Sequence, residues 1–544
     1  MDFFVGVDVG TGSARAALVA ANGKVRKVAA CPLEIFHPAP NFYEQSSDNI
    51  WSAVCHVVKS VVAGISAENV KGIGFDATCS LVALDNTGSP VTVSITGQEK
   101  QNVILWMDHR AQEEADFINS TGHDALQYVG GKVSLEMQTP KMLWLKKNLP
   151  ASWSSAALLF DLPDFLTWKA TESESRSLCS LVCKWNYTAN LDGKNGWDES
   201  FFEQLNLREL KKDNWKKIGN DVRVPGDAIE PGLSAKAAAE LGLLEGTPVG
   251  TSLIDAHAGG LGMIGCYAPD VSPNFSNRLA LICGTSTCHM IVNEKKIFVN
   301  GVWGPYYNAM ISGFWLNEGG QSATGKLLDH IIGTHPATPG IIMKHLTGNK
   351  HIQQYLSELL HVMAEQRNLQ NVSYLTRDLH VWPDFHGNRS PLADPSLKGM
   401  VSGLSLSVDE EHLALLYLAT VQALTYGTKY IIETLTAAGH NIEGILVCGG
   451  LSRNRLFIQT QADVLSLPVL CPVEQESVLV GAAILGACAT KKYSMHETIK
   501  RMAGTANIVK PASDCYKYHL RKYHVFKKMV LDQQDYKKIM SEEL

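Results

Sequence analysis

Two short segments combine glycine with hydroxyl side chains directly after an apolar stretch. They are Gly10-Thr11-Gly12-Ser13 and Gly284-Thr285-Ser286-Thr287. Glycine leaves room for an anion to approach the backbone, and amide N–H groups together with Thr and Ser hydroxyls can converge on a phosphate. Either segment alone is usually a simple hairpin turn, but two of them, one at the head of each half of the chain, favour a pair of phosphate loops. The sequence has no GxxxxGK[ST] motif, which excludes a P-loop enzyme.

Asp8 directly precedes the first of these loops. A carboxylate beside phosphate oxygens is unfavourable unless a cation lies between them, so Asp8 predicts a Mg²⁺ ion held partly through water. A third glycine site, Gly449-Gly450, ends the apolar run 444–448 and is followed by Asn454. Because glycine has no side chain, its backbone can lie against a purine or a ribose. A plain turn between a strand and a helix would explain these two glycines equally well.

Two isolated acidic residues could contact a bound polar molecule. Asp255 stands among small residues in LIDAHAGG, where an aspartate is either a helix N-cap or a general base, and the residues alone favour the cap. His257, two residues later, is expected to have a structural role. Glu318 is a lone acid in the apolar stretch WLNEGG. Acids are rarely buried without a partner, and a sugar would be one such partner.

The elements that must position these residues can be read from apolar runs and turn residues. We expect strands at 3–9, 14–20, 73–77, 279–283, 290–292 and 444–448, a strand running into a helix from 247, and helices at 47–63, 410–438 and from about 454. Residues 150–225 read as an irregular insertion, and the chain after 491 as terminal helices whose basic cluster, 517–528, faces solvent. The unit of strand, Gly-Thr-Ser tip and strand occurs twice, which indicates duplicated domains.

The composition sets outer limits. A chain of 544 residues exceeds the roughly 250–300 residues of one hydrophobic core, so two large domains are expected. The net charge of −6 gives no reason to expect nucleic acid or a membrane surface as a partner. No apolar run is long enough to span a bilayer, and no signal peptide is recognisable. The 12 cysteines, including Cys179 and Cys183, lack a metal-site spacing and predict reduced thiols in a cytoplasmic protein.

Five segments then occur in a recognisable order: DVGTGSARAAL, SLIDAHAGG, ICGTSTCHM, DFHGNRSPLADPSLKG and VCGGLSRNRLFIQTQADVLSLPV. Together they resemble the FGGY carbohydrate kinases, from residue 5 to about 490, and most closely the ribulokinase-like branch. The resemblance implies an α/β protein with two ribonuclease-H-like (actin-like ATPase) domains flanking an ATP cleft. We expect a sugar-binding domain at 1–270 with the first loop and the base, a nucleotide-binding domain at 271–491, and a helical tail at 492–544.

The resemblance also implies an activity and a set of site residues. The activity is ATP- and Mg²⁺-dependent phosphorylation of a ketopentose, most closely D-ribulose to D-ribulose 5-phosphate. Asp255 matches the family's catalytic base, which reverses the preference for a cap. Lys184 is similar to the sugar-contacting lysine of ribulokinases, and Thr78 and Cys79 to the loop beside the ketose, with Glu318 as a further sugar ligand. The expected ATP-binding residues are Gly10, Thr11, Gly12, Ser13, Arg15, Gly284, Thr285, Gly325, Gly450 and Asn454.

Several alternatives stay open at this point. Asp108-His109-Arg110 resembles a family signature, and we expect it to form a structural ion pair. The Arg-Glu pair with which glycerol kinases hold glycerol is absent before Trp106, which argues against glycerol. L-Ribulose, D-xylulose and ribitol differ from D-ribulose by one or two hydroxyls or an oxidation state, which sequence does not resolve. A chaperone- or filament-type ATPase would use the same fold without a sugar. Family members are often homodimers, and the sequence leaves the oligomeric state open.

Overall fold

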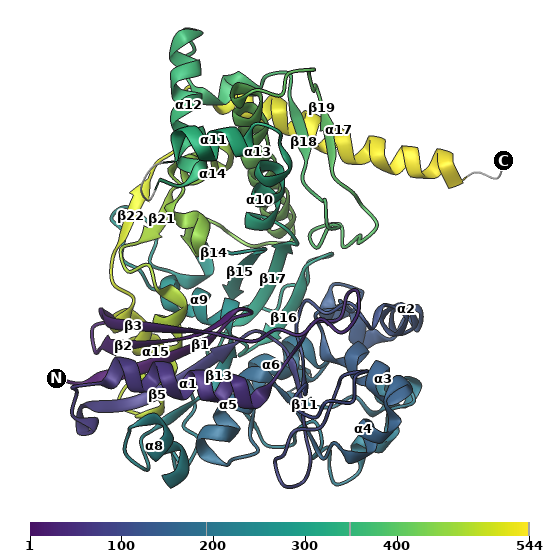
Figure 1. Cartoon of the computed structure of the whole chain (residues 1–544), viewed down its shortest axis with the longest axis vertical. Helices are drawn as coiled ribbons and strands as arrows, with labels where there is room; N and C mark the ends of the chain where they lie inside the picture. The colour runs from purple at the N-terminus through teal and green to yellow at the C-terminus, as the bar shows by residue number, and fades with distance from the viewer. Residues whose placement is uncertain (192, 347–349, 542–544) are drawn as a thin grey trace. The chain divides into compact units, whose positions relative to one another are not determined.

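The computed structural model describes residues 1–191, 193–346 and 350–541, and the chain packs as two compact units (Figure 1). The first unit comprises Met1–Tyr267, Met290–Asn317 and Val473–Thr505, and the second comprises Ala268–His289, Glu318–Pro472 and Ala506–Leu544. The division by packing therefore differs from a division into consecutive stretches. None of the described helices combines the length and the apolar character needed to cross a membrane.

A five-stranded sheet forms the centre of the first unit. Its order is β13 (Val249–Ile254), β5 (Val70–Ala77), β1 (Phe3–Val9), β2 (Ser13–Ala20) and β3 (Val25–Pro32). β13, β5 and β1 run parallel, whereas β2 and β3 are antiparallel additions to β1. The predicted hairpin and the predicted strand at 73–77 are confirmed, and the hairpin register places Asp8 opposite Arg15.

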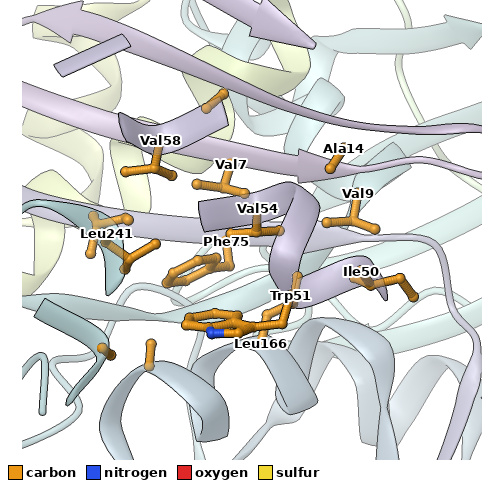
Figure 2. Close-up of a cluster of buried hydrophobic side chains, with 14 of the residues drawn as sticks. Val7, Val9, Ala14, Ile50, Trp51, Val54, Val58, Phe75, Leu166 and Leu241 are labelled. Carbon is orange, nitrogen blue, oxygen red and sulfur yellow. The ribbon is translucent and has the colours of Figure 1, made fainter. Parts of the chain in front are cut away.

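One face of this sheet is covered by α1 (Ser47–Val62), α5 (Leu162–Thr171) and α8 (Ala235–Leu241). Figure 2 shows side chains of α1, such as Val54 and Val58, against Val7 of β1 and Phe75 of β5. Every second residue of a strand points to the same face, so the even-numbered residues of β1 and β5 face the other side.

The opposite face is covered by α15 (Ser477–Ala489), which lies far from these strands in the sequence. A Cβ atom built on Gly6 would lie 2.0 Å from the carbonyl oxygen of Leu479, and one built on Gly74 would lie 2.0 Å from that of Ala482. The strands and the helix can approach this closely only because these positions are glycine. Asp8 and Asp76, further along the same strands, lie on this α15 side.

The remainder of the first unit is more regular than expected. The prediction of an irregular insertion at 150–225 is wrong, because apolar side chains in this stretch build strands and helices. These elements are α4 (Pro150–Ser155), β8 (Leu158–Asp161), α5, β9 (Arg176–Ser177), α6 (Leu178–Lys184), β10 (Thr188–Leu191), β11 (Lys194–Gly196), α7 (Glu199–Gln204) and β12 (Val222–Arg223). A four-stranded sheet joins β8 to earlier strands in the order β4 (Glu44–Gln45), β7 (Val103–Ile104), β6 (Leu81–Leu84) and β8. Helices α2 (Gln112–Ser120) and α3 (Gln138–Asn148) lie between β7 and β8 in the sequence. The other elements of the unit include α9 (Asp255–Ile264), β16 (Trp303–Tyr307) and α16 (Met495–Met502).

A seven-stranded sheet has the order β16, β17 (Trp315–Gln321), β15 (Thr287–Asn293), β14 (Arg278–Cys283), β20 (Gly444–Cys448), β21 (Val469–Pro472) and β22 (Ala506–Val509). Of these strands, β14, β20, β21 and β22 belong entirely to the second unit. The predicted strands at 279–283 and 444–448 and the helix at 410–438 are confirmed, the last as α13 (Glu410–Ala437). The other elements are α10 (Gly325–Thr334), α11 (Thr338–His345), α12 (Ile352–Gln366), β18 (His380–Trp382), β19 (Met400–Ser402), α14 (Arg455–Leu465) and α17 (Tyr516–Ser541).

The C-terminal helix α17 corrects one expectation. The basic cluster 517–528 was expected to face solvent, but Lys522 is only 6% exposed. Its ammonium group donates to the carbonyl oxygens of Thr376 and Leu379, at 2.7 Å and 2.6 Å. These two acceptors explain how a lysine can be buried in the second unit.

Candidate active site

Three aspartates follow or end the three parallel strands of the first unit. Asp8 and Asp76 are register partners near the ends of β1 and β5. Asp255 is the first residue of α9, directly after β13. The carboxyl ends of neighbouring parallel strands meet at one edge of a sheet, which is the usual place for a ligand in such folds.

The charges of these acids are coupled. Burial, followed by the negative charges of Asp8 and Asp255, holds the pKa of Asp76 well above its usual range. Burial also raises the pKa of Asp8, although the nearby Arg15 opposes that rise. Neither carboxyl oxygen of Asp76 makes a well-formed hydrogen bond to another described residue. A proton shared by these acids, or a cation bound between them, would relieve this repulsion.

The first glycine loop is the tip of the hairpin between β1 and β2. The amide of Gly10 donates to the carbonyl oxygen of Ser13 at 3.0 Å. Side chains from later segments fix Thr11, because Trp106 Nε1 donates to its hydroxyl and Gln45 Nε2 to its carbonyl oxygen, both at 2.9 Å. No described atom lies within 4 Å of the position a Cβ on Gly12 would take, so the tip leaves space beside its backbone.

Thr78, Cys79 and Lys184 belong to one polar region of the first unit. Thr78 and Cys79 directly follow β5, and Lys184 is the last residue of α6. The Lys184 ammonium lies 3.7 Å from a carboxylate oxygen of Glu136 and 4.3 Å from the centre of the Trp303 ring. Cys79 is joined to the same region, since its thiol lies 4.0 Å from the carbonyl oxygen of Glu136. The ammonium group can donate hydrogen bonds to sugar hydroxyls, the carboxylate can accept them, and the aromatic ring lies beside the ammonium group.

His257 and the Asp108–Arg110 pair make side-chain contacts within this unit. His257 Nε2 lies 3.4 Å from the thiol of Cys183, which links α9 to α6. The Arg110 guanidinium bonds Asp108 and Glu44, each at 2.8 Å, and all three side chains are buried. The expected structural ion pair is therefore present, with Glu44 as an additional acid.

In the second unit, the second glycine loop packs against the start of α10. A Cβ on Gly325 would lie 2.6 Å from the carbonyl oxygen of Gly284, so only glycine fits there. The amides of Thr324 and Lys326 donate to the carbonyl oxygen of Thr285, at 2.9 Å and 3.2 Å. Gly325 thus lies against the second loop itself, and its contact with ATP stays a prediction.

The third glycine site meets the same strand end. Gly449 has a φ of 87°, and a Cβ there would lie 2.4 Å from the carbonyl oxygen of Cys283, the last residue of β14. Gly450 is exposed and has no described atom within 4 Å of a Cβ position. Asn454 caps α14 by accepting from the Phe457 amide at 3.1 Å, and its amide group donates to Tyr417 at 2.6 Å and to Gln353 at 3.1 Å. The side chain of Asn454 is therefore held by the protein.

Glu318 lies on β17 and is 2% exposed. Its carboxylate forms an ion pair with Arg389, from the DFHGNRSP segment. The burial of Glu318 therefore has an explanation within the protein, and its assignment to a sugar stays a prediction.

Comparison with known proteins places these features in a family. Residues 3–262 match the N-terminal domain, and residues 279–490 the C-terminal domain, of the FGGY family of carbohydrate kinases. The chain belongs to this family. It is accordingly a sugar kinase, a phosphotransferase that acts on sugar hydroxyl groups.

Individual relatives cover almost the entire chain. The human FGGY carbohydrate kinase domain-containing protein is 51% identical over 552 residues, which is 99% of this chain and 98% of the relative. A D-ribulokinase of Saccharomyces cerevisiae is 41% identical and covers 92% of this chain and 74% of its own length. The crystal structure of xylulose kinase from Rhodospirillum rubrum has a TM-score of 0.77 at 18% identity, covering 98% of this chain and 99% of that one. The fold is therefore the two-domain, actin-like ATPase fold of these kinases.

The carboxylates of this kinase fit a divalent cation. Hard cations such as Mg²⁺ prefer carboxylate and water oxygens, and the poorly satisfied oxygens of Asp76 beside Asp8 provide them. Asp76 was missed in the sequence, because a single aspartate in the apolar run GIGFDA gives no signal until the parallel pairing of β1 and β5 places it beside Asp8. Glu136, Arg389 and Glu476 were missed for the same reason, since each acquires its importance from a partner distant in sequence.

Proposed function

We propose that this kinase phosphorylates D-ribulose to D-ribulose 5-phosphate with ATP. The observation that carries the proposal is the 41% identity to a D-ribulokinase over 92% of this chain. The polar region around Lys184 supports it, because it offers a ketose both a donor and an acceptor within 3.7 Å of each other.

Asp255 acts as the general base in this proposal. It would accept the proton of the terminal sugar hydroxyl as that oxygen attacks the γ-phosphorus of ATP. The amide of Ala256 donates to the Asp255 carboxylate at 2.7 Å, which fixes the side chain at the start of α9. Packing of α9 against α15 gives this base a rigid support.

The sugar would be held by Lys184, Thr78 and Cys79, with Glu318 as a further ligand. Lys184 donates to sugar oxygens, and its contact with the Trp303 ring restricts its position. The small side chains of Thr78 and Cys79 allow the ketose carbonyl end to approach the strand end closely.

The nucleotide phosphates would bind the two glycine loops, at Gly10–Ser13 and Gly284–Thr285, with Arg15 as an additional cation. Gly450, Asn454 and Gly325 are proposed for the adenosine part, and Gly325 also packs against the second loop. Asp8 and Asp76 would hold Mg²⁺, which supplies positive charge to the phosphate oxygens.

The test is ADP release with a panel of D-ribulose, L-ribulose, D-xylulose and ribitol, together with Asp255→Asn. We expect the highest kcat/KM with D-ribulose and no ADP release above background without a sugar. Asp255→Asn should lower kcat by about 10²–10⁴-fold, because it removes a general base. A higher kcat/KM for another pentose would overturn the substrate, sugar-independent ATP hydrolysis would overturn the kinase reaction, and full activity of the variant would overturn the base.

A further inference from the structure

Arg15 stands between two acids of the first unit. Asp8 is its register partner across the hairpin, yet the nearest guanidinium nitrogen is 3.7 Å from the Asp8 carboxylate. That separation is too long for a hydrogen bond. The guanidinium instead forms a direct ion pair with Glu476, the residue that precedes α15.

Glu476 is held firmly in this position. A Cβ on Gly262 of α9 would lie 1.9 Å from the carbonyl oxygen of Ser477, and one on Gly481 would lie 1.9 Å from that of Ala258. The first turns of α15 are thus packed against α9 without room to shift. Because α15 also packs on β1, Glu476 is fixed relative to the strand that carries Asp8.

A guanidinium and a divalent cation compete for the same carboxylate. If Arg15 paired fully with Asp8, the carboxylate would be neutralised and a cation would bind it more weakly. Glu476 pairs with the other terminal nitrogen of Arg15 and so opposes this pairing.

We propose that Glu476 is a positioning residue that holds Arg15 apart from Asp8 and thereby keeps the Asp8 carboxylate available to the divalent cation. The inference rests on the proposed role of Asp8 in metal binding. Glu476 itself touches neither metal nor substrate in this proposal, and its effect passes through Arg15.

The experiment measures Mn²⁺ binding to the full-length protein, without nucleotide, by the loss of the free Mn²⁺ signal in electron paramagnetic resonance. The variants are Glu476→Gln, Arg15→Gln and the double substitution, with thermal melts to verify folding. We expect Glu476→Gln to weaken Mn²⁺ binding about fivefold, a change typical of one partly exposed charge contact. In the Arg15→Gln background the same substitution should have no further effect, since the competing cation is then absent.

Glu474 provides a matched control. It lies two residues away, carries the same charge and accepts hydrogen bonds from the amides of Val25 and Glu476 on its two carboxylate oxygens, of which glutamine can keep one. Glu474→Gln should leave Mn²⁺ binding unchanged. The proposal is overturned if Glu476→Gln binds Mn²⁺ like the wild type, if it weakens binding equally without Arg15, or if Glu474→Gln has the same effect. Asp8→Asn separates the two proposals, because unchanged Mn²⁺ binding in that variant would refute the metal role of Asp8 itself.

Discussion

Several residues in the proposed sugar region are held in place by hydrogen bonds that involve one buried acid, Asp161, or its partners. Asp161, at the end of β8, accepts hydrogen bonds from Gln138 Nε2 at 2.9 Å and from Trp185 Nε1 at 2.8 Å. Gln138 also donates to the carbonyl oxygen of Cys79 at 3.1 Å, and Trp185 follows Lys184. Asp161 therefore orients both sides of the region in which we place the sugar. Burial, followed by the neighbouring Asp164, raises its pKa to about 7.

This raised pKa predicts a pH dependence of stability. The folded state binds the Asp161 proton more tightly than the unfolded chain, whose aspartate has a pKa of about 3.9. The contribution of Asp161 to stability therefore falls as the pH rises from about 4 to about 7. Asn does not titrate, so the melting temperature of Asp161→Asn, measured relative to the wild type, should be more favourable at pH 8 than at pH 5.

The control is Asp85→Asn. Asp85 is half-buried, and hydrogen bonds from Thr87 and Ser89 hold its pKa below the usual value. It stays ionised across this range, so the melting difference of its variant should be the same at both pH values. An Asp161→Asn difference that also stays constant between pH 5 and pH 8 would contradict the raised pKa.

At the scale of secondary-structure elements, α15 packs against segments that are far from it in the sequence. It packs on the strands that carry Asp8 and Asp76 and on the helix that carries Asp255. The close contact between α15 and α9 is steric, so it can be tested with one methyl group.

Gly481→Ala should destabilise the protein by about 1–3 kcal/mol, because the added Cβ would lie 1.9 Å from the carbonyl oxygen of Ala258 and a packed core resists expansion. Since Ala258 belongs to α9, kcat should fall as well. Gly333→Ala in α10 is the matched control: no described atom lies within 4 Å of its Cβ position, so the change should be neutral or stabilising by about 0.5–1 kcal/mol. Urea unfolding and kcat of both variants check this. Equal stability of Gly481→Ala and the wild type would show that α15 can move away from α9.

The same element shows what sequence could and could not predict. The hairpin, the strand before Asp255 and the long helix α13 were predicted because alternation and helical spacing are local properties of the chain. The return of α15 to the first sheet depends on glycines at 6, 74 and 481, each unremarkable alone, and was not predicted. The candidate site was likewise predicted only in part. Thr78, Cys79 and Lys184 do lie in one region, whereas the partners Asp76, Glu136 and Arg389 became visible only through pairing across the fold.

At the scale of the whole molecule, the five-stranded sheet belongs to the first unit, and β14, β20, β21 and β22 belong to the second. The last helix of the chain, α17, belongs to the second unit. There Phe526 lies with its ring centre 4.4 Å from that of Trp382, and Lys522 donates to the carbonyl oxygens of Thr376 and Leu379. Burial lowers the pKa of Lys522 to about 8, so these two bonds are needed to hold a charged group in the interior at neutral pH.

Lys522→Met removes that donor and should lower the stability of the second unit by about 1–3 kcal/mol, the cost of leaving buried acceptors without a partner. Hydrogen exchange measured by mass spectrometry should become faster in β18 and α13, which pack against α17, and should stay unchanged in β1, β5 and β13 of the first unit. Lys528→Met, on the exposed side of α17 and paired only with Asp532 among the described residues, should leave exchange nearly unchanged, because surface ion pairs contribute little. Equal acceleration of exchange in both sheets would mean that the units unfold together, and α17 would then stabilise the whole kinase rather than one half of it.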